Sequence, residues 1–448
     1  MCFLSLIFSG IKPIIDFGWM MTLGLLVSLT ITFTLLPAIL NLLSKSTSNY
    51  KDEEKSKITS FFAGVAQKNT KAIIVSAVSV IIISIVGISK LEVENSFINY
   101  FDKDTEIYKG MKLIDNKLGG TTPLSIIVRF PKKEKNENID DEFESWGDED
   151  EDDSKYWFTR NKIDKIIKIH DYLDNLEGVG KVISFASMVR VAEDLNNGKE
   201  LQGLELGVLY TKIPDSIKKE VIDPYISIKN NEARINLRII DSKENLRRND
   251  LIKKINYDLE NKLGLNKNDF KLAGVLILYN NLLQSLFKSQ ILTLGVVMAG
   301  ITLMFLILFR NITLSLIGVV PNFMAAFLIL GIIGLLKIPL DMMTITIAAI
   351  TIGIAVDNSI HYIYRFKEEF KKIKNYNQTL EKCHETVGVA ILNTSITIIF
   401  GFSILVLSNF IPTIYFGVFT GIAMLLAMVS VLTLLPKLIL IVKPFGND

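Results

Sequence analysis

Seven long runs of apolar residues dominate this sequence. They fall at 17–43, 71–88, 291–309, 314–336, 339–364, 387–407 and 414–442. Each approaches the roughly 20 residues that a helix needs to cross about 30 Å of hydrocarbon. Backbone N–H and C=O groups find no water in lipid, so such runs fold as helices. With a shorter run at 1–11, the sequence predicts an α-helical polytopic membrane protein with about eight membrane helices, the first truncated.

The basic residues predict the orientation of these helices. Residues 44–71 contain six Lys, and residues 365–385 contain five Lys and one Arg. Loops rich in Lys and Arg stay on the cytoplasmic side, whereas the opposite turns hold only Lys12 and Lys337. We therefore expect a multi-pass protein of the cell membrane with a cytoplasmic C-terminus and one large domain outside.

That large domain is the polar region 89–284. Its periodicity predicts strands at 122–130, 180–185, 233–240 and 270–273, and helices at 160–176 and 249–263. The order β-α-β-β-α-β is that of a split βαβ sandwich, an α+β domain of the ferredoxin-like type, with a largely helical insertion between Ser187 and Pro224. We expect an external, porter-like domain.

Two compositional features limit the function. Residues 137–153 contain eleven acidic residues and no basic one. Calcium binding is conceivable, but the segment lacks the Gly-centred loop of an EF-hand, so we interpret it as a solvated insertion. The 49 basic and 47 acidic residues nearly cancel, which gives no reason to expect nucleic-acid binding. No Walker, HExxH or GxSxG motif occurs; we expect no enzyme, cofactor or metal, and energy from an ion gradient.

The two ends of the chain resemble one another. With a shift of 399 positions, Pro13 aligns with Pro412, and the Thr-Leu-Leu-Pro that ends at Pro37 aligns with the one that ends at Pro436. We interpret 1–43 as the last two helices of a truncated first repeat, 44–70 as a cytoplasmic linker, 71–88 as the first helix of a second repeat and 285–448 as its five-helix membrane bundle. We therefore expect an N-terminally truncated fragment, or one half of a split system whose missing N-terminal half is a separate chain.

The fifth long run, 339–364, contains the residues that are energetically most unfavourable in lipid. It holds Gly353-Ile-Ala-Val-Asp357-Asn-Ser-Ile-His361, and a charged Asp in hydrocarbon costs roughly 2.5–3.5 kcal/mol on insertion scales. Desolvation would move the pKa of a buried carboxylate toward neutrality, as a proton carrier requires. His361 lies one turn later on the same face and could relay protons. Gly353 leaves room for a neighbouring helix.

Polar residues elsewhere in the membrane runs are possible partners of this site. Asn358 is adjacent in sequence, and Asn393, Thr394 and Ser395 place polar groups in the next run; Asn322 is a weaker candidate. Each has an alternative role: Asp357 as a structural hydrogen-bonding group, His361 as a headgroup-level residue, and Asn393 and Thr394 as helix-contact residues.

The ordered motifs resemble the resistance-nodulation-division (RND) superfamily, specifically its MMPL-like exporters. The similar motifs are Gly-Val-Val-Pro321-Asn, Ile338-Pro-Leu-Asp341, Gly353-x-x-x-Asp357-x-x-x-His361 and the Leu-Leu-Pro436 close. The resemblance covers nearly the whole chain as the C-terminal part of such a protein. It implies proton-gradient-driven export of lipids or other hydrophobic molecules across the bilayer, with Asp357 as the proton-carrying residue. Members often place Tyr after this Asp, whereas Asn358 follows here.

Two other readings share this helix arrangement. A Patched-like lipid- or sterol-sensing protein is one, although residues 90–290 contain no cysteine and such eukaryotic external domains are usually disulfide-rich. A Sec-type protein-export accessory subunit is the other, and a protein cargo would identify it.

Overall fold

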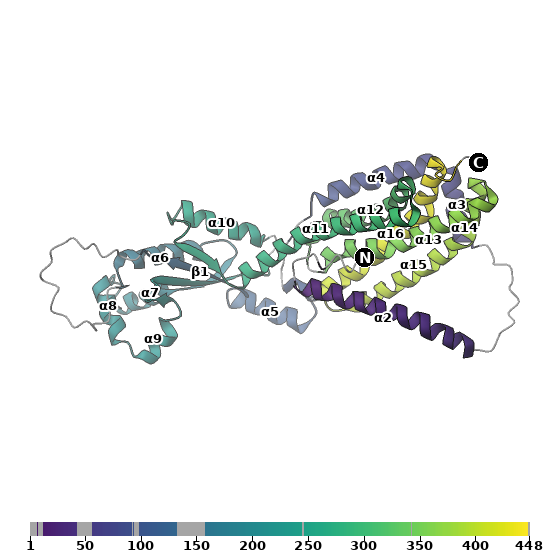
Figure 1. The fold of residues 1–448 in the computed structure, drawn as a ribbon. Coiled ribbons are helices and arrows are strands. Elements are labelled where there is room, and N and C mark those ends of the chain that lie inside the picture. The colour runs from purple at the N-terminus through teal and green to yellow at the C-terminus, as the bar shows by residue number, and fades with distance from the viewer. Residues whose placement is uncertain are drawn as a thin grey trace. The chain divides into compact units, whose positions relative to one another are not determined.

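The computed structural model describes residues 7, 12–42, 56–91, 93, 98–131, 157–243, 246–341 and 343–446. The chain divides into two compact units, one formed by Met1–Glu94 with Leu283–Asp448 and the other by Asn95–Leu282. Figure 1 shows the elements of both units, coloured along the chain. Each unit is described by itself below.

Seven helices in the described part of the chain are long and apolar enough to cross a membrane. They are α2 (Lys12–Leu42), α4 (Thr70–Ile88), α11 (Val275–Phe309), α12 (Ile312–Leu335), α13 (Ile347–Ile373), α15 (Val387–Ser403) with the 3₁₀ turn η5 (Ile404–Leu407), and α16 (Ile411–Val442). They coincide with the seven apolar runs. The expected truncated helix 1–11 lies outside the described residues, except for Ile7.

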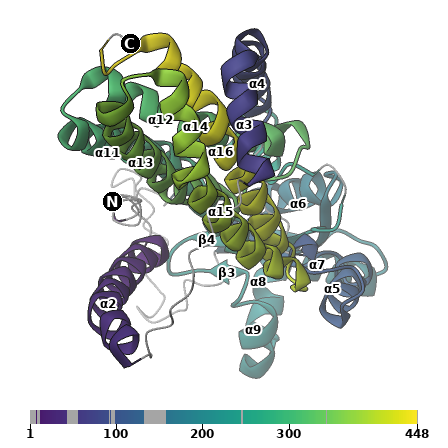
Figure 2. The same ribbon diagram turned by 90° about the vertical axis from the view of Figure 1, so that its right-hand side faces the viewer.

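The helix α12 is the centre of the first unit. It packs against α4, α13 and α16 (Figure 2), and its Leu314, Ile317, Val319 and Ala326 belong to one apolar core with residues of α11, α13 and α16. By contrast, α2 has no buried residue in its most apolar 18-residue window. Helix α2, which we predicted to be the last helix of a first repeat, therefore contributes almost nothing to the core formed by the helices of the second repeat.

The closest approach in this unit joins α4 to α12 through small residues. A Cβ added at Gly87 would lie 2.0 Å from the Gly331 carbonyl oxygen, and one added at Gly334 would lie 2.0 Å from the Gly87 carbonyl oxygen. Ser84 continues the same face one turn earlier, where Gly331 packs against its Cα. Small residues let membrane helices approach until their backbones touch, which maximises dispersion contacts where no hydrophobic effect separates helix from lipid.

Two short helices pack against the end of α16. They are α3 (Lys57–Lys68) and α14 (Tyr376–Glu385). Gln67 of α3 donates a hydrogen bond to Glu381 of α14 (3.1 Å), and Lys437 of α16 donates to the Gln67 carbonyl oxygen (3.3 Å). From the sequence we predicted a linker at 44–70, and we did not predict the helix α3.

The second unit contains a small antiparallel sheet. Its strands are β1 (Thr122–Arg129), β2 (Val179–Ile183), β3 (Ile226–Ser227), β4 (Glu232–Ile239) and β5 (Phe270–Ala273), in the order β2-β4-β1-β5 with β3 paired to β4. All pairings are antiparallel, with Ser125 opposite Asn236 at the centre. The four strands expected from the sequence are present.

Helices cover one face of this sheet. The unit's helical elements are η2 (Ile98–Tyr100), α5 (Glu106–Lys117), α6 (Arg160–Asp174), α7 (Phe185–Leu195), α8 (Gly203–Lys212), α9 (Asp215–Val221) and α10 (Arg248–Asn261). Ile163 and Ile166 of α6 and Ile255 of α10 are buried in one core with Ile126 and Ile235 of the sheet. The opposite face carries polar side chains, because successive strand residues point to opposite sides. The acidic insertion 137–153 lies outside the described residues.

The α4–α12 contact gives a test. We expect Gly331→Ala to lower the thermal unfolding midpoint of the detergent-solubilised protein, since its Cβ would lie 2.7 Å from Ser84 Cα and overpacking typically costs about 1–3 kcal/mol. Gly295→Ala is the matched control, because nothing lies within 4 Å of its added Cβ and Ala is the better helix former. Equal midpoints for the two variants would contradict the close contact.

Candidate functional site

The helix α13 carries the polar stretch singled out in the sequence. Asp357 and His361 lie one turn apart on its outer face, with side chains 74% and 66% exposed, and His361 Nε2 is 3.6 Å from Asp357 Oδ1. Gly353, one turn before Asp357, is half-buried. The sequence analysis expected a carboxylate desolvated within the chain. In the described residues Asp357 is instead at the surface of the bundle, and its recorded ion-pair partner is His361.

The two residues after Asp357 face different helices. Each residue turns about 100° around an α-helix, so Asn358 and Ser359 point inward where Asp357 points outward. Asn358 Nδ2 donates to Ser395 Oγ of α15 (3.4 Å), and Ser359 Oγ accepts from Asn322 Nδ2 of α12 (2.9 Å). All four of these side chains are buried. They join α13 to α12 and α15.

The polar residues of α15 that we predicted as partners of Asp357 face different sides of that helix. Asn393 and Thr394 lie on the exposed side of the helix, and Thr394 Oγ1 donates to the carbonyl oxygens of Ala390 (3.0 Å) and Ile391 (3.1 Å) in its own helix. Ser395, next along the chain, makes the contact with α13. Asn322, considered the weaker candidate, holds the shorter of the two interhelical hydrogen bonds.

His384 belongs to the packed structure, although it lies in the Lys-rich stretch 365–385. It is 1% exposed in α14, where Nδ1 lies 3.2 Å from Tyr362 Oη and Nε2 lies 3.0 Å from the Leu432 carbonyl oxygen. Burial lowers the pKa of this imidazole, an effect that the hydrogen bonds to carbonyl oxygens oppose. The spacing of buried Tyr376, Leu380 and His384 at every fourth position was the available signal.

The described residues contain no group of three His, Cys, Asp or Glu side chains placed to hold a metal ion. Three buried oxygens in the described bundle lack a hydrogen-bond partner: Asn322 Oδ1, Thr351 Oγ1 and Thr420 Oγ1.

The second unit has an apolar groove between helices α7, α8 and α9. Its volume is about 410 Å³, and its lining is apolar except for one phenol: Phe158, Phe185, Met188, Val189, Val191, Ala192, Leu195, Leu206, Tyr210, Ile213, Ile217, Val221 and Ile222. Several of these large side chains are exposed, including Leu195 and Val191. A groove of this size and lining fits a small hydrophobic ligand.

The environment of His384 predicts a pH effect on stability. Because the folded state lowers the pKa of His384, the unfolded chain binds its proton first on acidification, and stability falls as pH drops through 6.5. We expect the thermal midpoint to fall less between pH 7.5 and 5.5 in His384→Gln than in the wild type. Gln378→Ala, on the exposed side of α14, should keep the wild-type fall. An unchanged fall in His384→Gln would contradict this assignment.

Comparison with known proteins agrees with these features. The model of the MMPL family matches residues 1–84 and 173–446. The chain is also similar to the protein named "Putative membrane protein MJ1562" of Methanocaldococcus jannaschii, with 25% identity over 390 residues, which cover 83% of this chain and 91% of that relative. The matched ranges include six of the seven membrane-length helices, most of α4 and the Asp357–His361 stretch. The chain belongs to the MMPL family and is a multi-pass membrane protein of the RND transporter type.

Proposed function

We propose that this protein is a proton-gradient-driven exporter of lipids or other hydrophobic molecules in the cell membrane. The observation that carries the proposal is the exposed Asp357–His361 pair on a membrane-length helix. Ionisable residues within membrane helices are expensive and mark ion pathways or relays. Family membership supports transport, and the pair supports protons as the coupling ion.

The geometry supplies a simple protonation step. At 3.6 Å, a protonated His361 imidazole would attract the Asp357 carboxylate. A proton taken up by Asp357 removes its negative charge and, with it, this attraction. Moving one charge through 100 mV is worth about 2.3 kcal/mol, close to the roughly 2.5–3.5 kcal/mol cost of a charged Asp in the membrane. Protonation of Asp357 therefore suffices to bias a conformational equilibrium.

The exposure of the pair implies a partner for this face of α13. A charged side chain facing lipid is unstable unless a neighbouring helix or a wet cavity covers it. We propose that helices of a first repeat cover it, carried by an N-terminal half. The similarity of 12–37 to 411–436 supports two related halves, because transporter sites lie where such repeats meet.

The charge of the short helices supports the proposed orientation. The segments that contain α3 and α14 carry the Lys-rich sequences expected in the cytoplasm. The unit Asn95–Leu282 lies in sequence between α4 and the membrane part of α11. With α3 and α14 in the cytoplasm, this unit would be outside the cell. Its strand order β2-β4-β1-β5 supports the ferredoxin-like arrangement proposed from the sequence.

The substrate class rests on the apolar groove of the external unit. Thirteen residues line it, none of them charged, so a ligand there gains mainly from burial of apolar surface. A hydrophobic cargo would bury its apolar surface in this groove, whereas a polar solute would lose its hydrogen bonds to water and find no replacement for them there.

The transport test uses membrane vesicles of the source cells with substitutions in the native gene, so that any partner chain is present. The probe is efflux of the hydrophobic dye Nile red after the vesicles are energised. We expect wild-type efflux to stop when an uncoupler collapses the proton gradient. Asp357→Asn should behave as a gene deletion, because the amide cannot take up a proton.

The control for this test is Asp194→Asn. Asp194 lies exposed in α7 of the other unit, so this change repeats the loss of one carboxylate and should leave efflux at the wild-type rate. Protein amounts in the vesicles must match among the variants. Uncoupler-sensitive efflux by Asp357→Asn at the wild-type rate would refute the proton-carrying role.

A further inference from the structure

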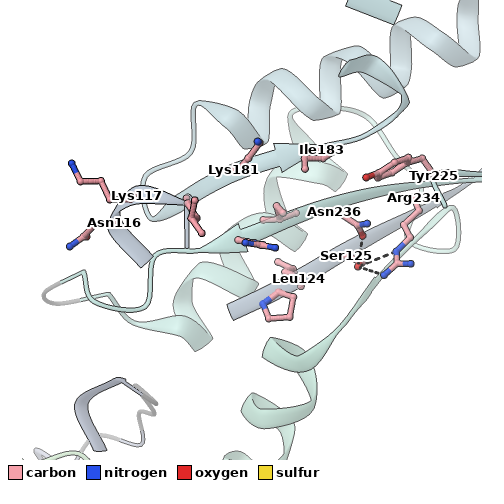
Figure 3. Close-up of a pocket in the computed structure, with 14 residues that line it drawn as sticks. Asn116, Lys117, Leu124, Ser125, Lys181, Ile183, Tyr225, Arg234 and Asn236 are labelled. Atoms are coloured by element: carbon pink, nitrogen blue, oxygen red, sulfur yellow. Dashed lines mark hydrogen bonds between the residues drawn. The ribbon is translucent and has the colours of Figure 1, made fainter. Parts of the chain in front are cut away.

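A second hollow of the external unit differs in character from the apolar groove. It has a volume of about 780 Å³ and is lined by residues of β1, β2, β4 and the end of α5, several of which are labelled in Figure 3. Its charged lining residues are Lys117, Lys181, Arg234 and Arg238. This volume is within the range of small-molecule sites, about 300–1,000 Å³.

The alternation of the strands brings these cations together. In β4, Ile235 and Leu237 face the core, so Arg234 and Arg238 emerge on the opposite face. Lys181 comes from β2, which pairs with β4 through Val182 opposite Leu237. Lys117 ends α5.

The described lining of this pocket is cationic. Among the described residues, no Asp or Glu lines it, although basic and acidic residues are nearly equal over the chain, 49 to 47, and none of the four cations forms an ion pair with a carboxylate. Glu232, the acidic residue on the same face of β4, pairs with Arg129 outside the pocket at 2.8 Å. The described lining therefore combines four cationic residues with no carboxylate.

Hydrogen bonds already hold part of this surface in place. Ser125 Oγ accepts from Arg234 Nε (3.3 Å) and Nη2 (3.1 Å) and donates to Asn236 Oδ1 (2.8 Å), as the dashed lines in Figure 3 show. These hydrogen bonds hold one edge of the Arg234 guanidinium against Ser125, so its remaining N–H groups point away from Ser125. Arg forks match the planar or tetrahedral oxygens of carboxylate and phosphate groups.

We propose that this pocket binds the anionic head group, a phosphate or carboxylate, of an amphiphilic molecule. Leu118, Pro123 and Ile183 also line the pocket and offer apolar contact to the carbons next to the head group. The inference rests on the proposed export function only for the role of this molecule as cargo. It narrows that cargo from hydrophobic molecules in general to anionic amphiphiles.

The test is equilibrium binding to the full-length protein in neutral detergent, measured by titration calorimetry. The probes are hexyl phosphate, inorganic phosphate and 1-hexanol, which separate the head group from the alkyl chain. We expect the wild type to bind hexyl phosphate more tightly than inorganic phosphate, to bind 1-hexanol weakly, and to lose affinity as salt rises. Arg234→Gln with Arg238→Gln should weaken hexyl phosphate binding at least tenfold.

The control is Lys165→Gln with Lys168→Gln. These exposed lysines lie on α6, which covers the other face of the sheet, and the pair changes the net charge by the same amount. It should bind hexyl phosphate within twofold of the wild type, and far-ultraviolet circular dichroism should be the same for both double variants.

Three results would overturn the proposal: no binding of hexyl phosphate, equal loss in the two double variants, or equal affinity for hexyl phosphate and 1-hexanol. Equal affinity for hexyl phosphate and inorganic phosphate would assign the pocket to a free oxyanion and refute the amphiphile. Since binding needs no proton gradient, the head-group site and gradient-driven export can fail separately.

Discussion

Polar groups in a membrane must find partners inside the protein, because lipid offers no hydrogen bonds. The first unit meets much of this requirement with hydrogen bonds between neighbouring helices, although Thr351 Oγ1 and Thr420 Oγ1 lack a partner among the described residues. Hydrogen bonds join α13 to α12 through Ser359 and Asn322, and to α15 through Asn358 and Ser395. His384 lies within hydrogen-bond distance of Tyr362 in α13 and of the Leu432 carbonyl oxygen in α16. Against this background, the outward-facing Asp357–His361 pair is the exception that calls for a function.

In the proposed function, the two hollows of the unit Asn95–Leu282 would share the recognition of one cargo. The groove between α7, α8 and α9 is apolar and excludes charge, whereas the pocket on the sheet is cationic and partly preorganised. Both arise from the same architecture, in which helices cover one sheet face and leave the other open. Apolar burial would then supply affinity and the cations selectivity among cargoes, in line with the usual division of labour in ligand sites.

Sequence reasoning located the spans and strands because their signals are local. Run length gave the seven helices, and alternation gave the four strands. It could not say which way each of Asp357, Asn358 and Ser359 faces, because that depends on which helices pack against α13. The cations of the sheet pocket come from three distant segments, so no window of sequence shows them together. The helix α3 was missed although Thr59, Ala63 and Ala66 are spaced for one buried face.

The backbone contact between α4 and α12 also limits how the molecule can move. Because Gly87, Gly331 and Gly334 leave no room for a side chain between α4 and α12, we expect these two helices to move together. The chain passes from α4 into the unit that begins at Asn95. A displacement of α12 would therefore carry α4 with it. In a transport cycle, α4 and α12 would move as one body, with the Asn322–Ser359 hydrogen bond joining α12 to α13.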